Sequence, residues 1–147
     1  ERRAALTLLH CRISLAVVAG RDSSVDGVAD AAPDRRVRQV PVEPDHHGLA
    51  DDEVVLVDCA TLWLTNRMLA DADLSEDTAA LLRALDACPA PVVMVTNELG
   101  WSIVPENALA RRFRDAQGRL NQTLAARADH VVTVIAGLPL VLKGAPA

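Results

Sequence analysis

The chain has 147 residues, of which 50% are hydrophobic and 24% are charged, and its formal net charge is −5. This length and balance fit one globular domain with a substantial core, whereas the acidic charge argues against a nucleic-acid partner or a polybasic membrane surface. The sequence contains no apolar run near the roughly 20 residues that a membrane-spanning helix needs, and Cys11-Arg12 interrupts the moderately apolar stretch over residues 6–19, so we expect neither a membrane span nor a signal peptide.

Residues 1–50 show little agreement between hydrophobic periodicity and turn signals. Ile13–Ala19 has the composition of a strand, and Gly20 could begin a turn. Residues 21–51 consist mostly of Asp, Arg, Val, Ala and Pro and have no sustained period, which is typical of a loop. We therefore expect an aberrant N-terminal segment over residues 1–50 that is poorly ordered or only partly packed.

From residue 53 onwards, periodicity and turn signals agree. Residues 53–58 form a continuous apolar run of the buried-strand type. Two helices are predicted next, over residues 60–74 and 75–87, with Ser75 as the N-cap of the second. Their apolar stripes are expected to contain Leu62, Leu64 and Leu69 in the first helix and Leu81, Leu82 and Leu85 in the second.

A second buried strand is predicted over Val92–Thr96, and a long helix follows from Pro105 to about Ala128. Proline suits the first turn of a helix, where its missing N–H would have no partner, and Glu106 would complement the helix dipole there. The core face of this helix is expected to contain Leu109, Phe113, Leu120 and Leu124.

A third strand is predicted over residues 131–136 and ends at Gly137, after which residues 138–142 continue extended. Strands that alternate with helices indicate an α/β fold with a mostly parallel sheet and helices on its faces. We expect residues 53–147 to form the remainder of a single α/β nucleotide-binding domain.

The three cysteines, Cys11, Cys59 and Cys88, are odd in number, widely spaced and without a CxxC pair. This pattern gives little support to a zinc site or a disulfide framework. We expect reduced, mostly buried thiols in a cytoplasmic protein.

Asp58 is the last residue of the first predicted buried strand. In open α/β sheets, ligands bind beyond the carboxyl ends of the strands, and an acid at such a place commonly holds Mg²⁺ beside nucleotide phosphates. A helix N-cap or a loop carboxylate explains the position equally well. Asp58 is thus a candidate for cofactor binding and for Mg²⁺ ligation.

Thr96, Asn97 and Glu98 end the second predicted strand. Their hydroxyl, amide and carboxylate could orient a nucleophile, bind ribose or support metal-bound water, or they could simply form a satisfied turn before the long helix. Because two parallel strands would present acidic ends at one edge, we favour a functional role. Glu98 is the catalytic candidate, and Thr96 and Asn97 are cofactor-binding candidates.

Other polar residues near these strands have more ordinary interpretations. Thr61, Thr65 and Asn66 could line the same crevice, but capping or exposure to solvent is favoured. Asn121 and Gln122 could be buried polar contacts or interface groups.

Arginines and tryptophans also lie in this part of the chain. One of Arg111, Arg112 and Arg114 could reach a phosphate, although a solvated helix face better explains at least two of them. Trp63 and Trp101 are predicted to be packing or interface residues, and Trp101 could instead contact substrate.

His46 and His47 stand side by side in a segment without periodicity. A neutral imidazole can attack phosphorus and form a covalent intermediate. A solvated loop is the favoured explanation, and His10 and His130 are weaker candidates.

Several long segments resemble conserved blocks of one family, the bifunctional adenosylcobinamide kinase/adenosylcobinamide-phosphate guanylyltransferases. The resembling segments are Val54–Asn66, Val95–Asn107, which is similar to the most diagnostic signature, Leu109–Gln122, Ala136–Leu140 and Lys143-Gly144. The similarity covers about residues 53–144, and blocks of this length and order are highly specific.

The resemblance implies a RecA-like P-loop NTPase-type fold and a role in cobalamin biosynthesis. Members of this family phosphorylate adenosylcobinamide with ATP or GTP and then transfer GMP from GTP to that phosphate through a guanylylated histidine, giving adenosylcobinamide-GDP. The resemblance implies Mg²⁺ as cofactor, a homo-oligomer with a trimer as best guess, and adenosylcobinamide and nucleotides as substrates. It matches Asp58 to an acidic nucleotide-binding position and Glu98 to the acid of the signature, with His46 as the candidate for guanylylation.

The N-terminal P-loop unit of that family is aberrant or missing in this chain. Residues 15–24 stand where a Gly-rich loop ending in Gly-Lys-Ser would be, and the only lysine is Lys143. One lost electrostatic donor can cost roughly 10²–10³ in rate. Two hypotheses therefore remain open: a kinase/guanylyltransferase with compromised catalysis, and an inactive relative that binds nucleotide weakly or pairs with an intact subunit. An unrelated α/β binding module is a third, which the signature disfavours.

Overall fold

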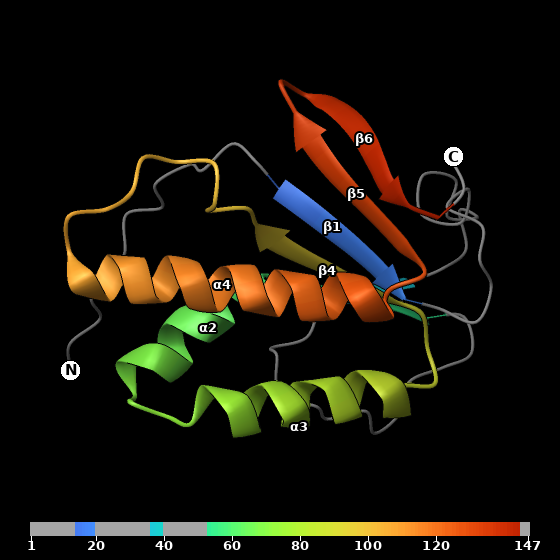
Figure 1. The fold of residues 1–147 in the computed structure, drawn as a ribbon. Coiled ribbons are helices and arrows are strands. Elements are labelled where there is room, and N and C mark those ends of the chain that lie inside the picture. Colours follow the sequence, from blue (N-terminus) through green and yellow to red (C-terminus); the bar gives the residue numbers. More distant parts are fainter. Residues whose placement is uncertain (1–13, 20–35, 40–52, 145–147) are drawn as a thin grey trace, which may run out of the picture.

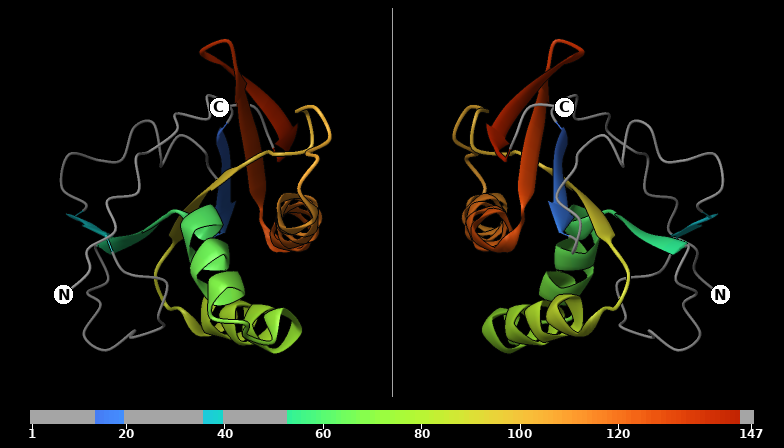
Figure 2. Two further views of the ribbon diagram at one scale, coloured as in Figure 1. Left: turned by 90° about the vertical axis from the view of Figure 1, so that its left-hand side faces the viewer. Right: turned by 90° about the vertical axis from the view of Figure 1, so that its right-hand side faces the viewer.

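The computed structural model describes residues 14–19, 36–39 and 53–144 (Figure 1). These residues form an α/β fold whose sheet has the strand order β2-β3-β4-β1-β5-β6. Helices α2, α3 and α4 all cover one face of this sheet (Figures 1 and 2). The strands are β1 (Ser14–Ala19), β2 (Arg36–Gln39), β3 (Glu53–Asp58), β4 (Val92–Asn97), β5 (His130–Ile135) and β6 (Leu138–Lys143), and the helices are α2 (Ala60–Leu69), α3 (Leu74–Ala87) and α4 (Ala108–Arg127).

The strand directions only partly follow the predicted parallel sheet. Strands β2, β3 and β4 are parallel neighbours, and β1 is antiparallel to both β4 and β5, so β5 runs in the same direction as β4. The strand predicted over Ile13–Ala19 is confirmed as β1, but its direction opposes its neighbours. Strand β6 also runs backwards, because Ala136 and Gly137 join it to β5 in a tight turn with φ values of 53° and 81°.

Strand β2 lies in the stretch that was expected to be a loop, so that prediction is wrong for residues 36–39. The strand is only four residues long and pairs with β3 in parallel register, which is too short for periodicity to reveal. The other residues of 20–52 lie outside the described part of the chain, so the N-terminal segment remains a prediction.

The hydrophobic core lies between the sheet and its helices. Along β4, buried and half-buried residues alternate, because the described helices cover only one face of the sheet. The buried apolar residues are Val55 and Val57 of β3, Val92 and Met94 of β4, Ala60, Leu64 and Met68 of α2, Leu81 of α3, Ala116, Leu120 and Leu124 of α4, Ala128 and Val131.

The predicted core faces of the helices are correct in part. Leu64 is 1% exposed, but Leu62 and Leu69 are 50% and 69% exposed, because α2 buries the face that contains Ala60, Leu64 and Met68. Leu81, Leu82, Leu85, Phe113, Leu120 and Leu124 are buried or pack against the core as predicted, whereas Leu109 is 51% exposed.

Two helix starts differ from the predictions. Asp73 caps α3 by accepting hydrogen bonds from the backbone N–H groups of Ser75 and Glu76, at 2.9 and 3.2 Å, so Ser75 lies inside the helix. Asn107 caps α4 in the same way, so Pro105 and Glu106 precede the helix and do not form its first turn. In both cases the helix begins after a side chain that accepts hydrogen bonds from two backbone N–H groups of the first turn.

The α3 cap gives a direct stability test. We expect Asp73→Ala to lower the free energy of unfolding by about 1 kcal/mol, because two backbone donors lose their acceptor. Ser75→Ala is the matched control and should change stability by less than about 0.5 kcal/mol. Urea unfolding measures both, and an equal loss in the two variants would contradict the assignment of the cap.

Cys59 and Cys88 are free thiols and are partly buried, while Cys11 lies outside the described residues. Within the described ranges, no helix combines the length and apolar character that a bilayer crossing requires.

Candidate functional site

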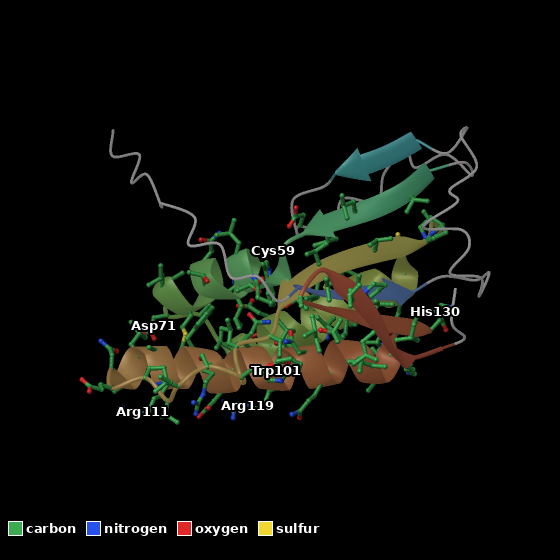
Figure 3. The ribbon with its side chains drawn as sticks, turned by 90° about the horizontal axis from the view of Figure 1, so that it is seen from above. Cys59, Asp71, Trp101, Arg111, Arg119 and His130 are labelled. Atoms are coloured by element: carbon green, nitrogen blue, oxygen red, sulfur yellow. The ribbon has the colours of Figure 1, made fainter. Side chains whose placement is uncertain are left out.

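The carboxyl ends of β3 and β4 lie at the same edge of the sheet. The strands are parallel neighbours, and Asp58 is in register with Val95. Asp58 is the last residue of β3. Strand β4 ends at Asn97, so Glu98 is the first residue after it and lies three residues beyond Val95. In Figure 3, Cys59 marks the junction of β3 and α2, and Trp101 marks the loop after β4. The carboxyl ends of the two strands share one edge, as the parallel pairing predicts. Asp58 lies on the sheet face of its partner Val95, whereas Glu98 contacts Asn121 of α4 on the helix-covered face, so a joint role of the two acids remains a prediction.

The two acids differ in their surroundings. Asp58 is exposed, whereas Glu98 is partly buried. One carboxylate oxygen of Glu98 accepts a hydrogen bond from the backbone N–H of Gly100 at 2.9 Å. A side chain at Gly100 would bring its Cβ to 3.0 Å from that oxygen, so glycine permits this close approach.

A buried polar network lies directly behind this edge. Thr96 and Gln117 are 0% exposed, and Asn121 is 4% exposed. The Thr96 hydroxyl donates to Asn121 Oδ1 at 2.9 Å, and Gln117 Nε2 donates to both Thr96 Oγ1 and Asn121 Oδ1, at 2.9 and 2.8 Å. The Thr96 hydroxyl is thus enclosed by protein, and Asn121 is confirmed as a buried polar contact. Gln122 beside it is exposed.

Thr61 of α2 extends the network to the end of β4. Its Oγ1 accepts a hydrogen bond from the backbone N–H of Asn97 at 2.9 Å and lies 3.3 Å from Thr96 Oγ1. The Thr65 hydroxyl donates to the carbonyl of Thr61 at 2.8 Å, within the helix. Thr61 therefore belongs to the site, whereas Thr65 is satisfied locally and Asn66 is exposed.

Asn121 connects the network to the loop after β4. Its Nδ2 donates to the carbonyl of Asn97 at 3.0 Å and lies 3.4 Å from Glu98 Oε2. Together with the Gly100 N–H, this amide gives each carboxylate oxygen of Glu98 a donor. Such contacts hold a side chain in one orientation at a site.

The far end of the same loop is fixed by Arg111. Its guanidinium donates to the carbonyls of Pro105 and Glu106 at the start of α4 (Figure 3). Arg114 forms a 3.6 Å ion pair with Asp115, and Arg112 is exposed. Arg111 and Arg112 are exposed and fit the solvated-face explanation, with Arg111 also supporting the loop, while Arg114 is partly buried beside Asp115.

The two tryptophans have different environments. Trp63 packs against the core, as predicted. Trp101 is 60% exposed, so packing does not explain its position. It remains a candidate for contact with a substrate or a partner.

An apolar groove of about 360 Å³ lies between α2 and the start of α4. Its lining includes Leu69 and Leu109, the two exposed leucines that were predicted to face the core. Thr65, Met68, Asn107, Ala110 and Phe113 complete the lining.

The candidate nucleophile His46 lies outside the described residues, as do His47 and His10. His130 is buried at the start of β5, at the opposite end of α4 from Arg111 (Figure 3). Sequence reasoning missed Gln117, although one signal was present: Gln117 and Asn121 interrupt the apolar face of α4 between Phe113 and Leu124 at helical spacing.

The donors at this edge are compatible with Mg²⁺ but not with a metal held by protein alone. Among the described residues, no group of three or more His, Cys, Asp or Glu side chains could hold a metal. Mg²⁺ at nucleotide sites is usually bound through one or two carboxylates together with phosphates and water. The exposed carboxylate of Asp58 fits that manner of binding.

Comparison with known proteins identifies one family. A family model described as cobinamide kinase/cobinamide phosphate guanyltransferase matches residues 39–142. The chain is 44% identical to the bifunctional adenosylcobalamin biosynthesis protein CobU of Salmonella typhimurium, over 65% of this chain and 61% of that protein. It is 45% identical to CobP of Pseudomonas aeruginosa, over 63% and 54% of the two chains, and 41% identical to CobU of Escherichia coli, over 67% and 62%. The chain thus spans little more than half to three-fifths of the length of these relatives.

Proposed function

This chain belongs to the cobinamide kinase/cobinamide phosphate guanylyltransferase family, and on that premise we propose that its sheet edge binds a nucleoside triphosphate for cobalamin biosynthesis. The proposed reactions are phosphorylation of adenosylcobinamide by ATP or GTP and GMP transfer from GTP to adenosylcobinamide phosphate. The proposed product is adenosylcobinamide-GDP. The proposed fold type is RecA-like, with the nucleotide beyond the carboxyl ends of β3 and β4.

One observation supports this proposal most strongly. Strand β3 ends in Asp58, its parallel neighbour β4 is followed directly by Glu98, and hydrogen bonds from Gly100 and Asn121 orient Glu98. In α/β sheets this edge is where ligands bind. A carboxylate whose two oxygens each accept a hydrogen bond from an amide N–H is preorganised to contact a ligand.

We assign separate roles to the polar groups of this edge. Asp58, which is exposed, would hold Mg²⁺ directly or through water, and the ion would neutralise charge on the nucleotide phosphates. Glu98 would position the ribose or the attacking hydroxyl by accepting its hydrogen bond. Asn97 is proposed to contact the nucleotide, and Thr96 to support it from the interior.

A second function has its own supporting observation. Lys143, the only lysine of the chain, donates to the carbonyls of Ala125 and Ala126 in the last turn of α4, at 3.1 and 2.9 Å. Its ammonium group is therefore engaged by the end of α4. An inactive relative that binds nucleotide weakly or pairs with an intact subunit is the alternative proposal. His46 remains the proposed site of guanylylation in the active alternative.

We also propose a homo-oligomer, with a trimer as the best guess. Leu138, Leu140 and Leu142 on the edge strand β6 are 70%, 49% and 59% exposed. An exposed apolar edge strand is a liability that association would remove. Sedimentation equilibrium measures the oligomeric state, and a monomer at micromolar concentration would contradict this part of the proposal.

Titration with GTP and Mg²⁺ tests nucleotide binding, and incubation with adenosylcobinamide tests turnover. Binding in the micromolar range with formation of adenosylcobinamide phosphate or adenosylcobinamide-GDP is the result expected of an active enzyme. Binding without product would favour the inactive relative. The absence of any binding would contradict the proposed role of this edge.

A further inference from the structure

The buried network behind the sheet edge has a fixed hydrogen-bond direction. We propose that Asn121 is a positioning residue, oriented by Thr96 and Gln117, that aligns Glu98 and the loop after β4 for the nucleotide. This inference rests on the proposed nucleotide site, but its structural part is testable without nucleotide.

The direction follows from counting donors and acceptors. The Thr61 hydroxyl oxygen accepts from the Asn97 N–H, so its hydrogen is available to Thr96 Oγ1 at 3.3 Å. Thr96 then accepts from Thr61 and Gln117, which uses both lone pairs of its oxygen, and its own hydrogen goes to Asn121 Oδ1. Asn121 Oδ1 accepts from Thr96 and Gln117 and has no capacity left.

This saturation determines which way the Asn121 amide faces. Because Oδ1 is turned toward two interior donors, Nδ2 must face the loop, where it meets the carbonyl of Asn97 and the carboxylate of Glu98. A flipped amide would place a donor against the Gln117 Nε2 and an acceptor against the Asn97 carbonyl. The interior thus specifies a donor at the sheet edge.

The orientation of the Gln117 amide leaves one buried acceptor without a hydrogen bond. Its Oε1 is buried and has no hydrogen-bond partner among the described residues. A flipped Gln117 amide would satisfy no more, because it would place Oε1 against Asn121 Oδ1, which is also an acceptor. A network made only for stability could be replaced by apolar side chains at little loss. The polar side chains of this network are therefore better explained by the orientation they impose on Glu98.

Asn121→Asp is the variant that isolates this role. It keeps the size of the side chain and an acceptor for Thr96 and Gln117, but it replaces the donor to Asn97 and Glu98 by a charge that repels Glu98. We expect hydrogen exchange of the Gly100 amide to become about tenfold faster, because Glu98 leaves its position. We also expect KM for Mg·GTP to rise about tenfold, with a smaller change in kcat, in whichever activity is present.

Gln122→Glu is the matched control, because it adds the same charge at the next residue of α4 but on an exposed side chain. A second pair avoids the added charge. Thr96→Val removes the hydroxyl at similar size and should accelerate Gly100 exchange, while Thr96→Ser keeps the hydroxyl and should restore slow exchange to within about twofold of the original.

Gly100 exchange tests the positioning role of Asn121, and Mg·GTP affinity tests the nucleotide site on which that role depends. Faster Gly100 exchange in Asn121→Asp and Thr96→Val, with the two controls unchanged, supports the positioning role even if the original chain binds no nucleotide, a result that would contradict only the proposed function. Unchanged Gly100 exchange in both variants overturns the inference. Faster exchange with unaltered Mg·GTP affinity would show that the network positions the loop but not the nucleotide, which also overturns it.

Discussion

The Leu64→Ala variant is expected to lose about 3 kcal/mol of its free energy of unfolding. Leu64 is 1% exposed and belongs to the core cluster between α2 and the sheet. Truncating a buried leucine removes hydrophobic transfer energy and leaves a cavity, and such changes cost about 2–5 kcal/mol. Urea or thermal unfolding measures the loss.

Leu62→Ala is the control on the same helix. Leu62 is 50% exposed, so its truncation should cost less than about 1 kcal/mol. Equal losses for the two leucines would contradict the burial of the face that contains Ala60, Leu64 and Met68. The same face positions Thr61, so a loosened α2 should also weaken the contact of Thr61 with the Asn97 N–H.

Asp58→Asn is expected to weaken Mg·GTP binding about tenfold or more, with little change in stability. The carboxylate is exposed at the end of β3, so its replacement should change the free energy of unfolding by less than about 0.5 kcal/mol. The loss of one negative charge beside a divalent cation is expected to cost at least about 1.4 kcal/mol of binding, which is a factor of ten. Isothermal titration with GTP and Mg²⁺ measures the affinity.

Asp71→Asn provides the control, because Asp71 is an exposed carboxylate at the far end of α2 (Figure 3). Its φ is 53°, a conformation that asparagine adopts readily, so this substitution adds no backbone strain. Weaker binding in both variants would indicate a general effect of charge. Unchanged affinity in Asp58→Asn would remove Asp58 from the site.

The sequence predicted most elements of residues 53–144 because two signals agreed there. Strand-type runs and helical stripes alternate there at spacings that are typical of an α/β arrangement. The misplaced helix starts have a physical cause: Asp73 and Asn107 can each accept two backbone N–H groups, and this outweighs the preference of Ser75 and Pro105 for helix starts. The expected stripe of α2 was wrong because Leu62 and Leu69 share one helical face and Leu64 lies on another, with Ala60 and Met68.

Part of the candidate site was also predictable from the sequence, and part was not. The common edge of Asp58 and Glu98 follows from the parallel pairing of β3 and β4, which the sequence pattern predicted. Gln117 was missed because its partner Thr96 is 21 residues away, on a different element. The antiparallel direction of β1 could not be predicted from the sequence. A six-residue apolar run predicts a strand but does not show whether the strand runs parallel or antiparallel to its neighbours.

The central claim is that Asp58 and Glu98 contact one Mg·triphosphate at a shared edge. A double-mutant cycle on Mg·GTP affinity, with Asp58→Asn, Glu98→Gln and the pair combined, tests it most directly. If both acids contact the same ligand, the two losses should be non-additive by at least about 0.5 kcal/mol. Strictly additive losses, or an affinity that Glu98→Gln leaves unchanged, would contradict the claim.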